Sequence, residues 1–292
     1  MTSTRLFPPC STSSFDKESG VALVMVLWML ALLTVIAGNV AFSVRTETRA
    51  VSNVSALAKA EAAADAGIHK AIYEVLRPIG ALGRWDADGT IIPWAFGDAN
   101  IYVTIRDESG KIDLNYAPAN LLAALFRVLE IPEQEALSLA DAIVDWRDTD
   151  NLRSLHGAEV DEYLAAGRPF GPANLPFQAI DELRLVLGMR PEIFRAIERV
   201  VTIHSRQGNI NTASAPPLVL LAMKTSAAPS LAQVNQGSRY LGIEVEAVLE
   251  DNTRFARMAV VRISGNTLEP FSILAYRTPR FDAATTRGVG PN

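Results

Sequence analysis

Cysteine is almost absent from this sequence of 292 residues, in which Cys10 is the single thiol. One cysteine cannot form an internal disulfide, and Cys10 lies ahead of a long apolar run near the N-terminus. If that stretch is removed, the mature chain has no thiol for catalysis. The chain also lacks an excess of positive charge, because its formal net charge is −5, and no cluster of Lys and Arg marks a nucleic-acid surface. We therefore expect no disulfide scaffold, no thiol enzyme and no nucleic-acid partner.

The motifs of common hydrolases and nucleotide-binding enzymes are missing as well. The chain has no HExxH, no GxSxG and no glycine-rich phosphate loop, and histidine occurs three times. His69 falls within a helical pattern, and His204 follows a β-like run, so we expect a structural role for both rather than a catalytic one. We predict that the chain is not an enzyme. An anchored hydrolase is the weakest alternative, since only an acidic loop favours it.

The most informative feature that is present is an apolar run over residues 21–44 without one charged side chain. A helix needs about 20 apolar residues to cross a bilayer core, and the run is too long for the apolar core of a cleaved secretory signal. An amphipathic pattern follows without a Gly or Pro at the junction and continues to about Arg77, where Pro78 and Gly80 end it. The pattern predicts one long helix, half in lipid and half in water. Its second half should carry an apolar stripe that comprises Val54, Leu57, Ala64, Ile68, Ala71, Ile72 and Val75.

Alternating apolar and polar residues predict strands on both sides of a helix-rich middle. One strand is expected at Ile101–Arg106, and residues 241–249, 255–263 and 270–277 form an antiparallel meander that the upstream strand joins. The middle, Leu114–Gln236, has helix candidates at Pro118–Leu129, Glu133–Trp146, Phe177–Leu187, Pro191–Val200 and Pro216–Lys224. The predicted fold class is α+β, with the long N-terminal helix packed on an antiparallel sheet and a large all-helical insertion.

An acidic loop is the strongest candidate for a binding site. It contains Asp145, Asp148, Asp150, Glu159 and Asp161, and oxygen ligands on a flexible loop suit Ca²⁺. An EF-hand frame fails, because Leu152 and Arg153 stand where an oxygen ligand and a glycine are needed. The residues fit a calcium loop of another kind equally well as a solvated acidic loop with a helix cap at Asp148 or Asp150. Zinc is disfavoured, since His156 is the one soft ligand nearby.

The junction at Gly20 resembles the N-terminus of type IV prepilins and pseudopilins, in which a glycine directly precedes an uncharged apolar helix. The resemblance implies cleavage by a prepilin peptidase between Gly20 and Val21, so that Val21 becomes the mature N-terminus. Most pilins have Glu at the fifth mature position, where this chain has Met25. A carboxylate within an apolar helix is costly unless a partner neutralises it. A subunit without that carboxylate is not built for such pairing, which suits a special position at the tip of a filament.

Several longer runs resemble one family, the K-type minor pseudopilin of type II secretion (GspK). They are VALVMVLWMLALL, ESGKIDLNYAP, DAIVDWRDTDN, GAEVDEYL and GNINTASAPPLVLLAM, which together sample nearly the whole mature chain. The resemblance implies a pilin-like head with a helical insertion, seated at the pseudopilus tip on the I and J pseudopilins. It also implies contacts with the H-type and major pseudopilins, a role in starting pseudopilus assembly for export of folded proteins across the outer membrane, and a structural calcium ion.

These expectations divide the chain into segments. A leader over 1–20 precedes the transmembrane half of the helix at 21–44, and 45–113 holds the amphipathic half and the first strand of the head. The helical insertion covers 114–236, the C-terminal strands 237–280 and a flexible tail 281–292. The protein should lie in the inner membrane as a single-pass protein with a periplasmic head. The alternative, an unprocessed membrane-anchored periplasmic binding domain, would keep its leader, so the N-terminal residue of the mature protein distinguishes the two.

Overall fold

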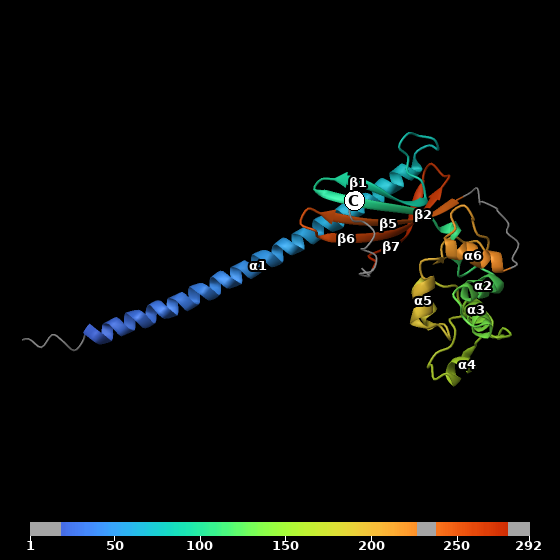
Figure 1. The fold of residues 1–292 in the computed structure, drawn as a ribbon, viewed down its shortest axis with the longest axis horizontal. Helices are drawn as coiled ribbons and strands as arrows, with labels where there is room; N and C mark the ends of the chain where they lie inside the picture. Colours follow the sequence, from blue (N-terminus) through green and yellow to red (C-terminus); the bar gives the residue numbers. More distant parts are fainter. Residues whose placement is uncertain (1–18, 227–237, 280–292) are drawn as a thin grey trace, which may run out of the picture. The chain divides into compact units, whose positions relative to one another are not determined.

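The computed structural model describes residues 19–226 and 238–279, which form an α+β fold, so the predicted fold class is confirmed (Figure 1). The long helix α1 (Ser19–Leu76) comes first, followed by strands β1 (Asp88–Phe96) and β2 (Ala99–Asp107). A helical insertion then precedes strands β5 (Ser238–Leu249), β6 (Arg254–Ser264) and β7 (Phe271–Arg277). These three strands are the predicted meander.

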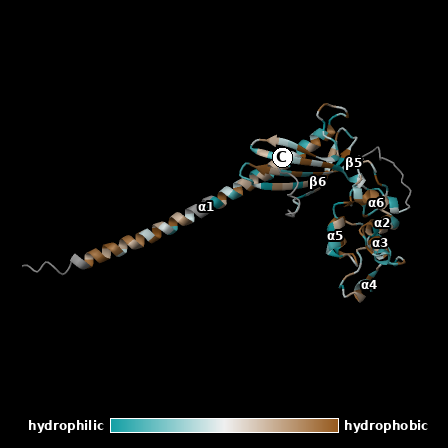
Figure 2. Ribbon diagram, viewed as in Figure 1, coloured by the Kyte–Doolittle hydropathy of each residue, from teal (hydrophilic) through white to brown (hydrophobic). Residues whose placement is uncertain are grey.

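The first part of α1 is apolar on all sides. Residues Val21–Ser43 are long and apolar enough to cross a membrane, and their side chains are exposed in the isolated chain. Figure 2 colours this part of the helix as the longest continuous hydrophobic stretch. A helix that is apolar all round requires lipid or other apolar helices around it.

The second part of α1 belongs to a compact unit that begins at Leu57 and includes the sheet. The buried side chains of this part recur at steps of three and four, and they are Ala60, Ala64, Ile68, Ala71, Ile72 and Val75. The predicted stripe is buried from Ala64 onward, whereas its first two residues, Val54 and Leu57, are 70% and 48% exposed in the isolated chain. Apolar periodicity alone does not reveal where the covering sheet begins.

The sheet is antiparallel throughout, with the strand order β1-β2-β5-β6-β7. β2 lies between β1 and β5 although it is far upstream of β5 in the sequence, and Ile101 pairs with Ala247 and Val103 with Val245. α1 packs very closely on these strands at Gly67, where an added Cβ would lie 2.7 Å from Val245 Cγ1. β1 was not predicted, because Pro93 interrupts its pattern; Pro is tolerated there because β1 is an edge strand.

The insertion has its own apolar core. Its regular elements are β3 (Ile112–Asp113), α2 (Ala119–Val128), α3 (Glu133–Arg147), α4 (Val160–Ala165), the 3₁₀ helix η2 (Ile180–Leu185), α5 (Pro191–Ile197), β4 (Val201–Thr202) and α6 (Pro217–Thr225). Its largest fully buried side chains include Phe126, Tyr163 and Phe194. The base of the insertion closes where β3 pairs in parallel with β4.

One predicted helix of the insertion is wrong. Phe177–Leu187 contains only the 3₁₀ helix η2 rather than an α-helix. Asn115 holds the start of this segment, since its Nδ2 donates to Phe177 O at 3.0 Å and its Oδ1 accepts from Phe177 N at 2.7 Å. Backbone groups that bond to a distant side chain are not available for helical hydrogen bonds.

A buried ion pair connects the sheet to the insertion. It lies in η1 (Glu108–Gly110) and the residue that follows, where Lys111 Nζ donates to Glu108 Oε1 at 2.6 Å. Both side chains are nearly inaccessible, and an added Cβ at Gly242 on β5 would lie 2.4 Å from the same carboxylate oxygen. A buried charge pair stabilises the fold only if its geometry is kept. The close packing of Glu108 against Gly242 therefore fixes the start of the insertion against β5.

Candidate functional site

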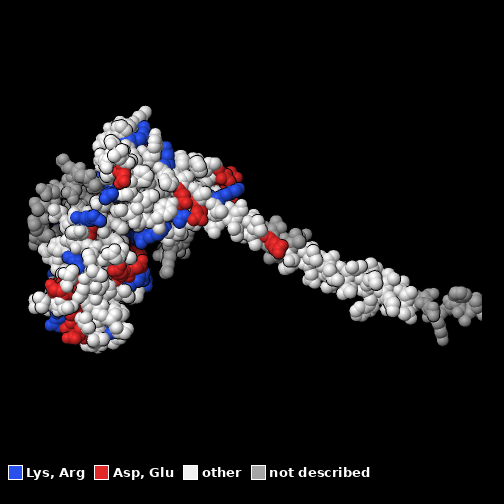
Figure 3. Space-filling model, turned by 180° about the vertical axis from the view of Figure 1, so that it is seen from behind, with Lys and Arg blue, Asp and Glu red and all other residues white. Residues whose placement is uncertain are grey.

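The predicted cleavage junction lies at the beginning of α1. The helix begins at Ser19, so Gly20 and Val21 fall within its first turn. Val21 is 60% exposed and Met25 is 68% exposed. Val21–Ser43 contains no acidic side chain (Figure 3), so a cationic group buried beside this segment in a membrane would find no carboxylate partner on it.

Asp145 organises the acidic loop after α3. Its carboxylate is fully buried, and both oxygens lie 3.2 Å from the backbone nitrogen of Ser154, which donates to them. The loop backbone comes so close that an added Cβ at Gly157 would lie 2.0 Å from Asp145 Oδ2. Only glycine fits this approach, so Asp145 acts as the anchor around which residues 154–158 fold.

Four oxygen atoms beside this anchor are buried without a hydrogen-bond partner. They are Asp148 Oδ1, both carboxylate oxygens of Glu159 and the amide oxygen of Asn174. The Asn174 amide nitrogen donates to Asp150 O at 3.0 Å and to Asn151 Oδ1 at 2.8 Å, which brings the segment around Asn174 against the loop. A buried carboxylate without a partner is costly, so this arrangement calls for a compensating charge.

The carboxylates also raise one another's pKa. Burial raises the pKa of Glu159, and the negative charges of Asp145, Asp148 and Asp150 raise it further. The pKa of Asp148 is raised by burial and then by Asp150 and Asp145. The loop therefore carries electrostatic repulsion that a cation would remove.

These residues fit a hard cation better than a transition metal. Within residues 19–226 and 238–279, no three His, Cys, Asp or Glu side chains converge closely enough to hold a metal by themselves. The unpaired set instead combines carboxylate and amide oxygens, which are ligands that Ca²⁺ accepts in flexible geometry.

The other predicted ligands lie at the edge of the loop. Asp150 is exposed, and its Oδ1 accepts from Leu152 N at 2.8 Å, which makes it a turn residue. Asp161 is exposed in the first turn of α4. Sequence reasoning missed Asn174, because no spacing rule connects it to a loop that lies 24 residues away.

Comparison with known proteins adds the family. The family model for type II secretion system protein K matches residues 103–206, which extend from β2 through β4 and include the acidic loop and Asn174. The type II secretion system protein K of Klebsiella pneumoniae is 28% identical over 243 residues, 75% of this chain and 74% of that protein. The protein K of Aeromonas hydrophila is 28% identical over 207 residues, which are 62% of each chain. By these matches the chain is similar to the K-type minor pseudopilins of type II secretion.

A solved structure agrees with this K-type fold. A chain from the GspK-GspI-GspJ complex of enterotoxigenic Escherichia coli matches with a TM-score of 0.59 and 19% identity. The match covers 80% of this chain and 100% of the solved chain. K-type pseudopilins are structural components of the secretion machinery, which is consistent with the prediction that this chain is not an enzyme.

Proposed function

We propose that this K-type pseudopilin caps the tip of the pseudopilus and helps to start its assembly for export of folded proteins. The observation that carries the proposal is the lack of a carboxylate in the membrane-spanning part of α1, with Met25 at the fifth position after Gly20. A shaft subunit uses that carboxylate to pair with the amine of a neighbour. A subunit without it suits the end of the filament, where one such neighbour is missing.

The proposed partners are the I and J minor pseudopilins. The likeness to a chain from a GspK-GspI-GspJ complex supports them. The H-type and major pseudopilins complete the proposed set, as the subunits that continue the filament below the tip. Before assembly, the protein would lie in the inner membrane through Val21–Ser43, with its head in the periplasm.

Co-purification tests this function with the full chain. The tagged protein and the I and J pseudopilins of the same secretion system are produced together and extracted in mild detergent. We expect a complex of the three, in which the present chain begins at Val21. A protein that keeps residues 1–20 and purifies without these subunits would instead support the anchored periplasmic binding domain.

We further propose that the acidic loop holds a structural Ca²⁺ ion. Asp148, Glu159 and Asn174 would supply ligands, because their buried oxygens have no other partner. Asp145 would act through the loop, by holding Ser154 in place. The cation would offset the repulsion among the carboxylates and keep the loop closed against the segment that carries Asn174.

A further inference from the structure

The loop after the C-terminal end of α1 displays two aliphatic side chains to solvent. Ile79 is 91% exposed and Leu82 is 95% exposed, the highest values among the large apolar residues of the described chain. A single exposed leucine is ordinary on a protein surface. Two such side chains on one short loop require a reason, because burying each of them elsewhere would be favourable.

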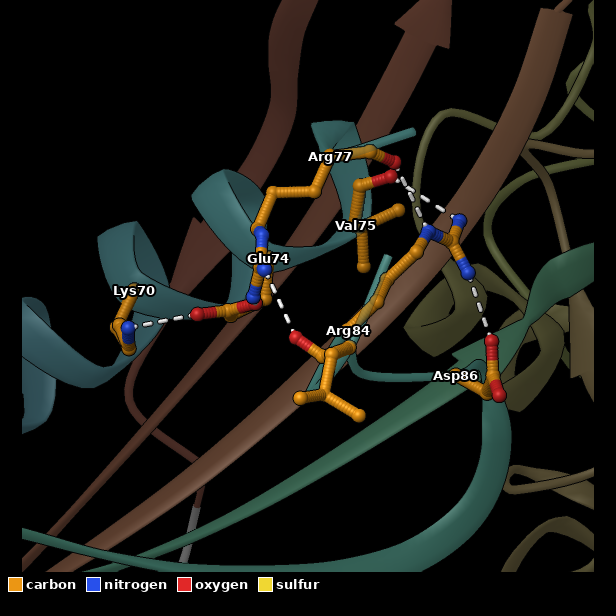
Figure 4. A network of polar contacts seen from close by, with 7 residues as sticks. Lys70, Glu74, Val75, Arg77, Arg84 and Asp86 are labelled. Carbon is orange, nitrogen blue, oxygen red and sulfur yellow. Dashed lines mark hydrogen bonds and ion pairs between the residues drawn. The ribbon is translucent and has the colours of Figure 1, made fainter. Parts of the chain in front are cut away.

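Polar contacts hold this loop firmly to the end of α1 (Figure 4). The guanidinium of Arg84 donates to Arg77 O at 3.0 Å and to Val75 O at 3.1 Å, so it satisfies carbonyls at the helix end. Arg77 in turn donates to Leu82 O at 2.8 Å.

The loop also folds on itself. Ala81 N donates to Pro78 O at 3.0 Å, and Arg84 N donates to Ala81 O at 3.1 Å. Gly80 and Gly83 have φ values of +85° and +73°, which other residues adopt only with strain. The aliphatic pair is therefore displayed by an ordered frame, in which several backbone polar groups are already bonded.

Cations and amphipathic rings surround the base of the loop. Lys70 Nζ lies 5.3 Å from the ring centre of Tyr73 and 5.9 Å from that of Trp85. Lys70 and Arg77 share the single carboxylate of Glu74, each at 2.7 Å, and Arg84 pairs with Asp86 at 2.7 Å. This cluster carries more positive than negative charge, in a chain whose net charge is −5.

We propose that the loop of residues 78–84 inserts Ile79 and Leu82 into the surface of a phospholipid bilayer that carries anionic headgroups. The aliphatic pair enters the acyl boundary, while Tyr73 and Trp85 lie at headgroup depth, where amphipathic rings are favoured. Lys70 and Arg77 face the phosphates through their long stems. Internal hydrogen bonds lower the cost of bringing the backbone of the loop to this depth. The proposal does not depend on the position of the subunit in a pseudopilus.

Fluorescence quenching by brominated lipid tests the proposal on the full chain. Cys10→Ser removes the natural thiol, and Ala81→Cys carries an environment-sensitive fluorophore within the loop. The protein is held in nanodiscs through Val21–Ser43. Brominated phosphatidylglycerol is supplied either in the nanodisc or in separate vesicles, so that contact with either surface is detected. We expect quenching in at least one arrangement, weaker quenching with brominated phosphatidylcholine, and a loss of quenching at high salt.

Variants of the aliphatic pair decide the outcome. Ile79→Ser and Leu82→Ser should each weaken the interaction about tenfold. Leu268→Ser is the matched control, because Leu268 is 89% exposed in the segment between β6 and β7, and it should change nothing. No quenching in either arrangement would overturn the proposal. It would favour burial of the aliphatic pair in an apolar pocket of a partner protein instead. Equal quenching of the serine variants and the parent would overturn it as well.

Discussion

Arg257 on β6 and Asp65 on α1 form a hydrogen-bonded ion pair across 192 residues of sequence, with Arg257 Nε 2.7 Å from Asp65 Oδ1. The same guanidinium pairs with Glu61 one turn earlier and donates to Thr278 at 2.9 Å. Arg257 is nearly buried, whereas the two carboxylates are partly exposed. Arg257 thus connects β6 to α1. The carboxylates of Asp65 and Glu61 neutralise its guanidinium, which would otherwise be a buried charge without a partner.

We expect Arg257→Ala to lower the free energy of unfolding by about 1.5–3 kcal/mol, the range for hydrogen bonds to charged groups. Arg254→Ala is the control, because Arg254 is 42% exposed on the same strand and its pair with Glu246 should contribute less than about 1 kcal/mol. Thermal or chemical denaturation of the detergent-solubilised protein measures both. An equal decrease in the free energy of unfolding for the two variants would show that burying the ion pair does not increase its contribution to stability.

The close approach of α1 to the sheet at Gly67 makes a second prediction. Gly67→Val should destabilise the protein by about 1–3 kcal/mol, because the added atoms would collide with Val245 and Ile101. Val245→Ala removes the atoms nearest to the added Cβ. The double variant should therefore be less destabilised than the sum of the single variants, which a double-mutant cycle detects. Additive effects would show that the helix shifts away from the sheet instead.

The sequence predicts most regular elements because their patterns are local. Strand alternation located β2 and the three C-terminal strands, and apolar length located the first part of α1. β1 was not predicted, since Pro93 interrupts its apolar residues and an edge strand needs no strict alternation. Phe177–Leu187 was predicted as an α-helix, and the two hydrogen bonds with Asn115 that fix its first residue come from 62 residues away, where no local pattern indicates them.

The sequence likewise predicts only the part of the candidate cation site that is local in the chain. Asp148 and Glu159 lie on one loop, so the sequence could group them. Asn174 joins them only through the fold, by its contacts with Asp150 O and Asn151. Exposure also depends on packing that no local pattern reveals, which is why Asp161 was included although it faces solvent.

Processing at Gly20 is a third prediction. A peptidase that cuts after glycine has no space for a branched side chain at that subsite, so Gly20→Leu should keep residues 1–20 on the chain. Mass spectrometry of the N-terminus should give Val21 for the parent and an intact leader for the variant. Gly38→Leu is a control, because an added Cβ at Gly38 meets nothing within 4 Å. A Gly20→Leu protein of mature size would contradict the prepilin assignment.

Calcium should stabilise the folded protein through the acidic loop. A ligand that binds only the folded state adds about 2.7 kcal/mol at a concentration one hundred times its dissociation constant. We expect calcium to raise the melting temperature by several degrees relative to chelator at matched ionic strength. Asn174→Ala should reduce the rise, and Asp161→Asn should leave it unchanged. Identical melting curves with calcium and with chelator would show that the loop is a solvated acidic turn.

The pH dependence of this effect follows from Glu159 and Asp148. Both pKa values are raised in the folded protein, so without calcium the folded state binds protons more tightly than the unfolded state. Stability in chelator should therefore rise as the pH falls through the raised pKa values toward the ordinary ones. The calcium effect has the opposite dependence, because protons compete with the cation, and it should be larger at about pH 8 than at about pH 5.

Glu159→Gln removes one buried negative charge, so it should raise the melting temperature in chelator at about pH 8 and lower it relative to the parent in calcium. Calorimetry at both pH values measures these signs, and a Glu159→Gln protein that is less stable than the parent in chelator would show that the carboxylate already has a partner within the fold.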